Sequence, residues 1–438
     1  MTQAPQPYAE YAASARLSAL LALVTTLDKR KPIDSSWASD RHFATMSPSD
    51  KAFAQMLAKS TIRRLGQIDA ILDQFLETPL NPKASRVKHI LRLGIVQLVW
   101  LHTPPHAAVH SAVELTKQLK LNKYSGLVNA VLKRASREAA AIAEKQDAAK
   151  LNTPDWLWKS WEIAYGPEIT RSIAEMHLRE PPLDITVKSD PDMWAAHLSG
   201  AVLPTGSVRL RETRNITQLK GFAEGFWWVQ DVAATIPARL LGDVRDKRVV
   251  DLCAAPGGKT AQLAVGGAKV SAVDMSKERL AMLKSNVHRL KLQADYVVTD
   301  ASKWLPAFAP DAILLDAPCS ATGTLRRHPD VAWLRDPSDI KRLVATQHKL
   351  LRHALDMLKP GGKMVYSVCS LQPEEGEEQI TALLRERNDV VLSPVDATVM
   401  GGLQESITPR GEIRTLPCHM AELDGMDGFY AAVLIKKE

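Results

Sequence analysis

Apolar residues recur at three- and four-residue steps through the first third of the chain, from Tyr11 to about Ala149. This spacing is typical of helices that bury one face. Proline-containing breaks, such as Lys31-Pro32 and Thr103-Pro104-Pro105, divide the pattern into five or more helices. The same spacing over residues 17–24 indicates an amphipathic helix rather than a signal peptide. Residues 1–149 are therefore predicted to form an all-α domain.

The pattern is mixed between residues 150 and 245. Two helical stretches, at 156–164 and 168–178, precede two short runs typical of strands, LDITVKS and FWWVQ. The second run contains Trp227 and Trp228, which have two interpretations. Tryptophans can stack on bases of single-stranded RNA, but adjacent tryptophans in a short strand usually pack, and we favour packing. We expect a small α+β connector that takes part in RNA recognition.

Strands and helices alternate from residue 246 to the end. The helices are expected near 277–291 and 340–358. The predicted strands are RVVDLCA, KVSAVDM, DYVVTDA, AILLDAPC, KMVYSVCS and GFYAAVLIKK. Such alternation predicts an α/β domain with a doubly wound, mostly parallel, Rossmann-like sheet, whose ligand binds at the carboxyl ends of the strands.

Composition narrows the class of protein. The 438 residues are 45% hydrophobic and 24% charged, as in an ordinary globular protein. No apolar run approaches the roughly 18–20 residues that cross a membrane, so we expect no membrane association. The four cysteines are too few for a disulfide scaffold, and no C-x-x-C pair indicates zinc, which favours a reduced, cytoplasmic location. His106 and His110 lack a third ligand, so we expect no metal site.

The charge is distributed unevenly. Residues 1–150 contain 21 Lys and Arg against 12 Asp and Glu, a net charge of +9, whereas the remainder carries −2. A basic domain commonly binds RNA or DNA. A solvated basic helical surface fits the same numbers, and charge alone favours neither interpretation.

The turn DLCAAPGGKT, at residues 251–260, combines a strand end with Gly257 and Gly258 before a helix. A P-loop would need glycine where Cys253 stands, and the nicotinamide fingerprint G-x-G-x-x-G is also absent. S-adenosylmethionine (SAM) has no phosphates and is cationic at sulfur, so it needs a permissive turn rather than a phosphate nest. SAM is therefore the expected cofactor.

Acidic residues and cysteines follow at successive strand ends. Asp274 ends the second strand, where a carboxylate can accept hydrogen bonds from both ribose hydroxyls. Asp300 ends the third strand, where an adenine amine would lie. The fourth strand leads into Asp316 and Cys319, and the fifth into Cys369. Two thiols and a carboxylate are thus expected beside the cofactor.

These motifs resemble known families. The stretches LRLGIVQLVWLHTPPHAAVHSAVELTK and GLVNAVLKR look like part of a NusB-like helical domain, which implies RNA binding. DLCAAPGGKT, VDM, DAPCSATGTLRRHPD and VYSVCSLQPEE resemble successive motifs of RNA cytosine-5 methyltransferases. Together they are similar to the bacterial Sun/RsmB (Fmu) group, which methylates 16S ribosomal RNA. The resemblance implies a NusB-like domain at 1–149, a connector at 150–245 and a methyltransferase domain at 246–438.

The resemblance also implies residue roles. Cys369 would attack C6 of cytosine, Cys319 would assist breakdown of the adduct, and Asp316 would hydrogen-bond N3 and the exocyclic amine. In DNA cytosine-5 methyltransferases the Pro-Cys cysteine is the nucleophile, which would reverse the two thiols. Val368 stands where the family usually has Thr, which removes a possible hydroxyl contact. The implied SAM-binding residues are Cys253, Ala254, Ala255, Pro256, Gly257, Gly258, Lys259, Asp274, Asp300 and Asp316.

Two other functions would leave different features in the sequence. An amino-group methyltransferase would have an aromatic residue in [DN]-P-P-[YFW] and needs no nucleophilic thiol, whereas this chain has D-A-P-C and two placed cysteines. A non-catalytic RNA-binding assembly factor would not need an intact cofactor turn. We therefore expect 5-methylcytosine formation in 16S ribosomal RNA by a monomer.

Overall fold

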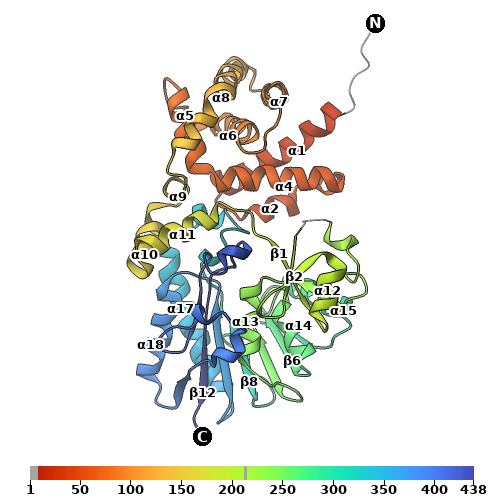
Figure 1. The fold of residues 1–438 in the computed structure, drawn as a ribbon, viewed down its shortest axis with the longest axis vertical. Helices are drawn as coiled ribbons and strands as arrows, with labels where there is room; N and C mark the ends of the chain where they lie inside the picture. The colour runs from red at the N-terminus through yellow and green to blue at the C-terminus, as the bar shows by residue number, and fades with distance from the viewer. Residues whose placement is uncertain (1–7, 212–214) are drawn as a thin grey trace. The chain divides into compact units, whose positions relative to one another are not determined.

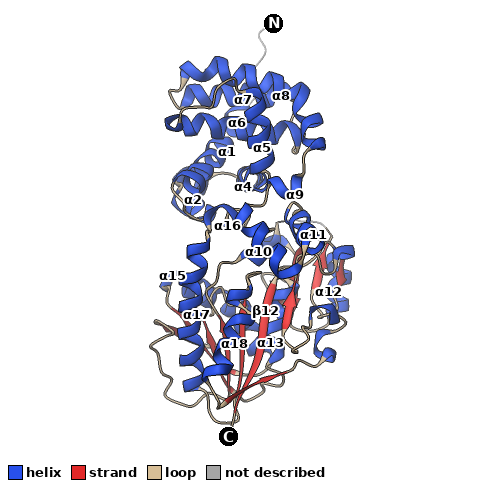
Figure 2. Ribbon diagram, turned by 90° about the vertical axis from the view of Figure 1, so that its left-hand side faces the viewer, coloured by secondary structure: helices blue, strands red, loops and turns tan. Residues whose placement is uncertain are grey.

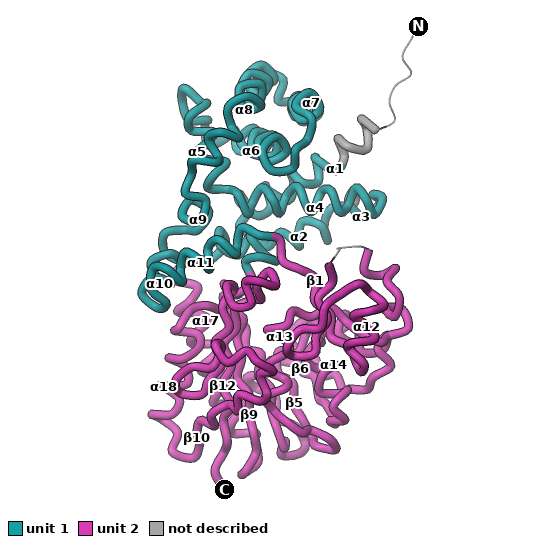
Figure 3. The backbone as a smooth tube through the Cα atoms, in the orientation of Figure 1, with its two compact units in different colours: residues 1–179, 325–336 teal, residues 180–324, 337–438 magenta. Residues whose placement is uncertain are grey.

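The computed structural model describes residues 8–211 and 215–438, and it separates into two compact units (Figure 3). Unit 1 comprises residues 1–179 and 325–336, and unit 2 comprises residues 180–324 and 337–438. The helices between residues 150 and 179 therefore group with unit 1, whereas the strands that follow residue 180 group with unit 2.

Unit 1 is helical throughout its described residues, as the apolar spacing predicts (Figure 1). Ile90, Leu91 and Ile95 are fully buried in its core, and α7 begins with Pro105 at its first position. The α-helices are α1 (Tyr8–Leu23), α2 (Ile33–Ser39), α3 (Arg41–Thr45), α4 (Pro48–Arg63), α5 (Leu65–Phe75), α6 (Ser85–Val99), α7 (Pro105–Gln118), α8 (Ser125–Lys145), α9 (Ala148–Leu151), α10 (Asp155–Tyr165), α11 (Pro167–His177) and α16 (Val331–Leu334).

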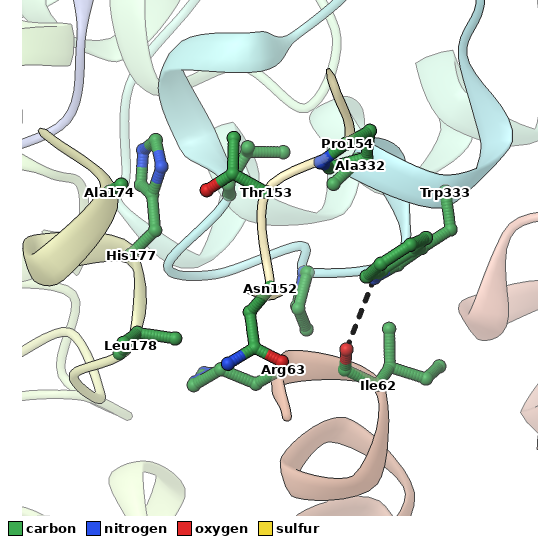
Figure 4. Close-up of a pocket in the computed structure, with 12 residues that line it drawn as sticks. Ile62, Arg63, Asn152, Thr153, Pro154, Ala174, His177, Leu178, Ala332 and Trp333 are labelled. Carbon is green, nitrogen blue, oxygen red and sulfur yellow. Dashed lines mark hydrogen bonds between the residues drawn. The ribbon is translucent and has the colours of Figure 1, made fainter. Parts of the chain in front are cut away.

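Helix α16 comes from the segment 325–336, which lies far along the sequence from the rest of unit 1. Figure 4 shows the indole Nε1 of Trp333 donating to the carbonyl oxygen of Ile62, at 3.2 Å. The Arg30 guanidinium donates to the Trp333 carbonyl at 2.9 Å, and the Asp330 carboxylate accepts from the amide of Ile33 at 3.0 Å. Two backbone groups and one side chain from the first 63 residues thus fix this segment.

A cavity of about 20 Å³ lies beside the segment, which is room for about one water molecule (Figure 4). His177 lines it and is only 7% exposed, and neither ring nitrogen has a hydrogen-bond partner among the described residues. Burial, together with the charges of Arg326 and Arg63, lowers the pKa of His177 to about 3. The folded unit therefore holds this imidazole neutral at ordinary pH.

Unit 2 is built on an eight-stranded sheet within the described residues, with the order β10-β12-β9-β8-β5-β6-β7 and β11 paired to β12. The strands from β5 to β9 run parallel to one another, whereas β12 is antiparallel to β9, β10 and β11. The bounds are β5 (Arg248–Leu252), β6 (Lys269–Asp274), β7 (Asp295–Val298), β8 (Ala312–Asp316), β9 (Lys363–Val368), β10 (Val390–Ser393), β11 (Ile413–Thr415) and β12 (Phe429–Lys436).

Helices cover both faces of this sheet (Figure 2). Helices α13 (Val232–Leu240) and α14 (Gly258–Val265) share one core with Val365 of β9, and α17 (Pro337–Met357) and α18 (Glu377–Glu386) share the other with Val368. Helix α15 (Lys277–Arg289) packs against β6 and β7. Val368 is fully buried in an apolar core, so a valine in place of the family's threonine suits this packing.

A second, antiparallel sheet in unit 2 has the order β2-β3-β1-β4, with α12 (Pro191–Leu198) packed against β2 and β3. Its strands are β1 (Leu183–Val187), β2 (Gly200–Val202), β3 (Val208–Leu210) and β4 (Trp227–Val229). Trp227 is fully buried, and Trp228 is buried with its Nε1 donating to Gln230 at 2.8 Å. The packing interpretation of this tryptophan pair is confirmed.

None of the helices described is both long and apolar enough to cross a membrane. No group of three or more His, Cys, Asp or Glu side chains in the same part of the chain is placed to hold a metal ion.

Candidate active site

The parallel strands β6, β5, β8 and β9 lie side by side, so their carboxyl ends meet at one edge of the sheet. The chain winds from β5 through β6 and β7 in one direction and from β8 to β9 in the other. The switch point between β5 and β8 is where an open α/β sheet forms its ligand crevice. All the predicted site residues follow strands at this edge.

The loop after β5 has a backbone that few residues adopt. Gly257 has a φ of +103°, and a Cβ there would lie 2.6 Å from Cγ of Leu283, so only glycine fits. Thr260 Oγ1 donates to Asp251 Oδ2 at 2.5 Å and joins the two ends of the loop. Burial raises the pKa of Asp251 to about 7 and that of Cys253 to about 12. Cys253 is therefore a thiol at neutral pH and not a nucleophile.

A cavity of about 560 Å³ opens beside this loop, within the size range of small-molecule sites. Asp274 lines it and is 2% exposed, and its carboxylate accepts from the amides of Ala255 at 3.2 Å and Ser276 at 3.0 Å. The Asp300 side chain is 45% exposed and accepts from the amide and hydroxyl of Ser302, which lowers the pKa of Asp300. Carboxylates with lone pairs to spare suit the hydroxyl and amine donors of SAM.

The remaining lining residues of this cavity include cations that the sequence analysis did not identify. Arg342 and Lys349 come from α17, together with Thr346. Their spacing places all three on one face of the helix, which is the signal that could have found them. The full lining is Cys253, Asp274, Met275, Arg279, Asp300, Ala301, Ser302, Pro318, Arg342, Ala345, Thr346, Lys349 and Leu350.

A second cavity, of about 420 Å³, is lined by residues 254–259 and Asp316. Lys259 Nζ donates to Asp316 Oδ2 at 2.7 Å, and Ser367 Oγ donates to Asp316 Oδ1 at 3.0 Å. Burial alone would lower the pKa of Lys259, but the charge of Asp316 outweighs it and raises that pKa. The structure thus divides the implied SAM-binding set between two cavities: Cys253, Asp274 and Asp300 line the first, and Ala254, Ala255, Pro256, Gly257, Gly258, Lys259 and Asp316 line the second.

The two cysteines lie against each other. Cys369 follows β9 directly, Cys319 lies in the loop after β8, and their Sγ atoms are 3.4 Å apart. The hydrogen bond to Cys369, together with burial, raises the pKa of Cys319 well above its usual range. The negative charge of Cys369 in turn helps to raise the pKa of Lys259. These interactions favour the protonated form of Cys319, and they place the Lys259 ammonium group where it interacts with Cys369.

Comparison with known proteins gives consistent matches. The family described as 16S rRNA methyltransferase RsmB/F matches residues 238–435, and the NusB family matches residues 13–137. Ribosomal RNA small subunit methyltransferase B of Cronobacter sakazakii is 36% identical over 410 residues, covering 90% of this chain and 92% of that protein. The protein of the same name from Sodalis glossinidius is 35% identical over 412 residues, with the same coverage.

A solved structure also matches the chain. A methyltransferase homolog from Pyrococcus horikoshii is 26% identical, with a TM-score of 0.52, covering 64% of this chain and 93% of that one. The identity to the curated relatives extends over nearly the whole of both chains, and it includes the helical part as well as the sheet. The chain therefore belongs to the RsmB/F family of SAM-dependent ribosomal RNA methyltransferases.

Proposed function

We propose that this protein forms 5-methylcytosine in 16S ribosomal RNA through a covalent bond between Cys369 and C6 of the target cytosine. The observation that carries the proposal is the pair of thiols, 3.4 Å apart at neighbouring strand ends. Methylation of an amino group needs no nucleophilic cysteine, so the pair favours attack on a ring carbon.

Cofactor binding is assigned to the first cavity and the loop beside it. Asp274 would accept the ribose hydroxyls, and Asp300 would accept the adenine amine. The backbone of residues 253–258 would contact the rest of the cofactor, with Lys259 and Asp316 where cofactor and base meet. SAM, when bound, supplies the methyl group.

The reaction needs a thiolate because C5 of cytosine is a poor nucleophile. Addition of the Cys369 sulfur to C6 forms the S–C6 bond and moves the electrons of the C5=C6 bond toward C5, which can then accept a methyl group. Asp316 would accept a hydrogen bond from the exocyclic amine and, when addition at C6 is accompanied by protonation of N3, from N3–H, where charge changes during addition. Loss of the C5 proton to solvent afterwards restores the C5=C6 double bond and expels Cys369 as the thiolate. The Cys319 thiol, 3.4 Å away, would donate its hydrogen bond to the departing sulfur.

Substrate binding is assigned to the helical part. The net charge of +9 over residues 1–150 suits RNA phosphates, and the target base must leave its stack, at a cost of a few kcal/mol. We retain the three sequence parts as functional divisions: 1–149 for RNA binding, 150–245 as connector and 246–438 for methyl transfer. We propose that the protein acts as a monomer in the cytoplasm.

Cysteine variants test the proposal. Cys369→Ala should lose methyl transfer and form no enzyme–RNA adduct. Cys319→Ala should methylate once and then stall as a covalent complex that survives denaturing electrophoresis. The double variant should lose that band, and Cys418→Ala, which changes a thiol lining neither cavity, should behave as the parent. A stalled adduct in Cys369→Ala instead would make Cys319 the nucleophile.

Two further measurements test the substrate and the alternative. Bisulfite mapping of ribosomal RNA from cells that lack this protein should show one cytosine without its methyl group. Titration calorimetry with SAM should give heat, whereas a non-catalytic assembly factor would give none.

A further inference from the structure

A buried carboxylate lies behind the two cysteines, and the proposed reaction does not use it. Glu375 is fully buried in the turn Pro373–Glu375. Its Oε1 accepts from the amide of Ser320 and from Gln347 Nε2, both at 2.9 Å. Its Oε2 accepts from the hydroxyls of Ser320 and Ser370, both at 2.5 Å. These donors stabilise a carboxylate that has no contact with water.

The hydrogen-bond donors to Glu375 come from the two loops that carry the cysteines. Ser320 directly follows Cys319, and Ser370 directly follows Cys369, so one carboxylate bonds to both cysteine loops. The two serine hydroxyls also lie 3.1 Å from each other. The sulfur atoms are on loops 50 residues apart, and this carboxylate joins those loops at the residues next to the sulfurs.

Burying a carboxylate in a protein core costs free energy, because the charge loses its contact with water. Replacing a buried ionic group by well-packed apolar residues is often neutral or stabilising, so stability alone does not account for Glu375. The hydrogen bond to Cys369 and burial are the main causes that raise the pKa of Cys319, and the charge of Glu375 raises it further. Lys259 carries the opposite charge and interacts with Cys369. The thiol pair therefore lies in a field that favours the proton on Cys319.

We propose that Glu375 is a positioning residue that ties the two cysteine loops together and directs the negative charge of the thiol pair to Cys369. The proposal deepens the proposed function and rests on it for the names of the two thiols. It also supplies a physical reason why one of two adjacent cysteines is the nucleophile.

Site-specific alkylation separates this role from a merely structural one. The full-length protein, Glu375→Gln and Glu375→Ala would be treated with iodoacetamide across a pH series, and each cysteine quantified by mass spectrometry. Glu412→Gln is the matched control, because Glu412 is also buried and accepts from Tyr430 Oη at 2.7 Å rather than from a residue of either cysteine loop. Melting temperature and SAM affinity would be recorded for all four proteins.

In the parent, Cys369 should react at neutral pH and Cys319 should not. Glu375→Gln keeps a polar group of the same shape but loses the charge, so the ratio of Cys369 to Cys319 alkylation should fall several-fold. Single-turnover methylation should slow in Glu375→Gln and slow further in Glu375→Ala, while SAM affinity stays unchanged. The control should keep the parent's alkylation ratio.

Unchanged alkylation selectivity in Glu375→Gln, with only a lower melting temperature, would overturn the proposal. The result does not depend on Glu375→Ala remaining folded, because the glutamine variant alone decides it. Failure of the proposed function would look different: Cys319→Ala would form no adduct with any ribosomal RNA, whatever the alkylation ratio.

Discussion

The buried carboxylate of Asp274 should control cofactor affinity more strongly than the exposed one of Asp300. Asp274 is 2% exposed, and both of its oxygens already accept from backbone amides, at 3.2 and 3.0 Å, which fixes the direction of the remaining lone pairs. The Asp300 side chain is 45% exposed, so water competes with any ligand for it. Asp274→Ala removes the acceptor for the ribose hydroxyls, and Asp300→Asn is the matched comparison.

Hydrogen bonds to a charged group contribute about 1.5–3 kcal/mol, and 1.4 kcal/mol is tenfold in affinity. Asp274→Ala should therefore raise the Kd for SAM by about 10- to 150-fold, Asp274→Asn by less, and Asp300→Asn by under about tenfold. Titration calorimetry measures SAM binding, and filter binding checks that RNA affinity persists. A larger loss in Asp300→Asn, or a loss of RNA affinity alone in Asp274→Ala, would refute the assignment of these strand ends.

Three other predictions concern stability, RNA binding and the thiols. Because His177 has a folded-state pKa of about 3, below its usual 6.5, the unfolded chain takes up the proton first, and stability should fall as pH drops through that window. The free energy of unfolding, measured by urea denaturation, should be lower at pH 5 by about 2 kcal/mol. This pH-dependent decrease should disappear in His177→Phe and persist in a variant of the exposed His106. Log affinity for RNA should fall linearly with log salt, and a flat dependence would give the basic helices another role. Diamide should oxidise Cys319 and Cys369 to a disulfide, taking up their two hydrogens, and dithiothreitol should restore methylation; continued methylation with the disulfide formed would contradict the assigned roles.

The helices of unit 1 and the strands from β5 to β9 could be predicted because each has a simple period. Helix α17 was expected at 340–358 and spans Pro337–Met357, and β6 ends at Asp274 as predicted. The short strands β10 and β11 were not predicted, since they are held by pairing with β12 rather than by a pattern of their own. Pairing partners far along the chain are not encoded in local periodicity. For the same reason, nothing in the sequence indicated that residues 325–336 would join the helical unit.

Some residues of the candidate site could also be predicted from the sequence, and others could not. The residues that follow strands, among them Asp274, Asp316 and Cys369, could be named because parallel strands deliver their carboxyl ends to one edge. Arg342 and Glu375 reach the site from outside the strand ends, on a helix and on a buried turn, and their importance depends on what packs beside them. A residue type at a strand end predicts chemistry, whereas a residue that supports the site is found only from its contacts.

The choice of nucleophile depends on residues that support the site and that do not lie at the strand ends. Cys319 and Cys369 follow adjacent parallel strands, so the backbone gives them nearly equivalent places, and sequence motifs allow either one to attack. Once one of two thiols in contact has lost its proton, the pair shares the proton that remains, and the charges around the pair decide which sulfur keeps it. Glu375 contacts the loop residue after each cysteine, and its charge raises the pKa of Cys319, whereas the positive charge of Lys259 interacts with Cys369. In the proposed reaction, a negative charge that favours the proton on Cys319 and a positive charge that interacts with Cys369 would leave Cys369 as the attacking sulfur and Cys319 as the acid, which is the asymmetry that a covalent addition followed by elimination requires.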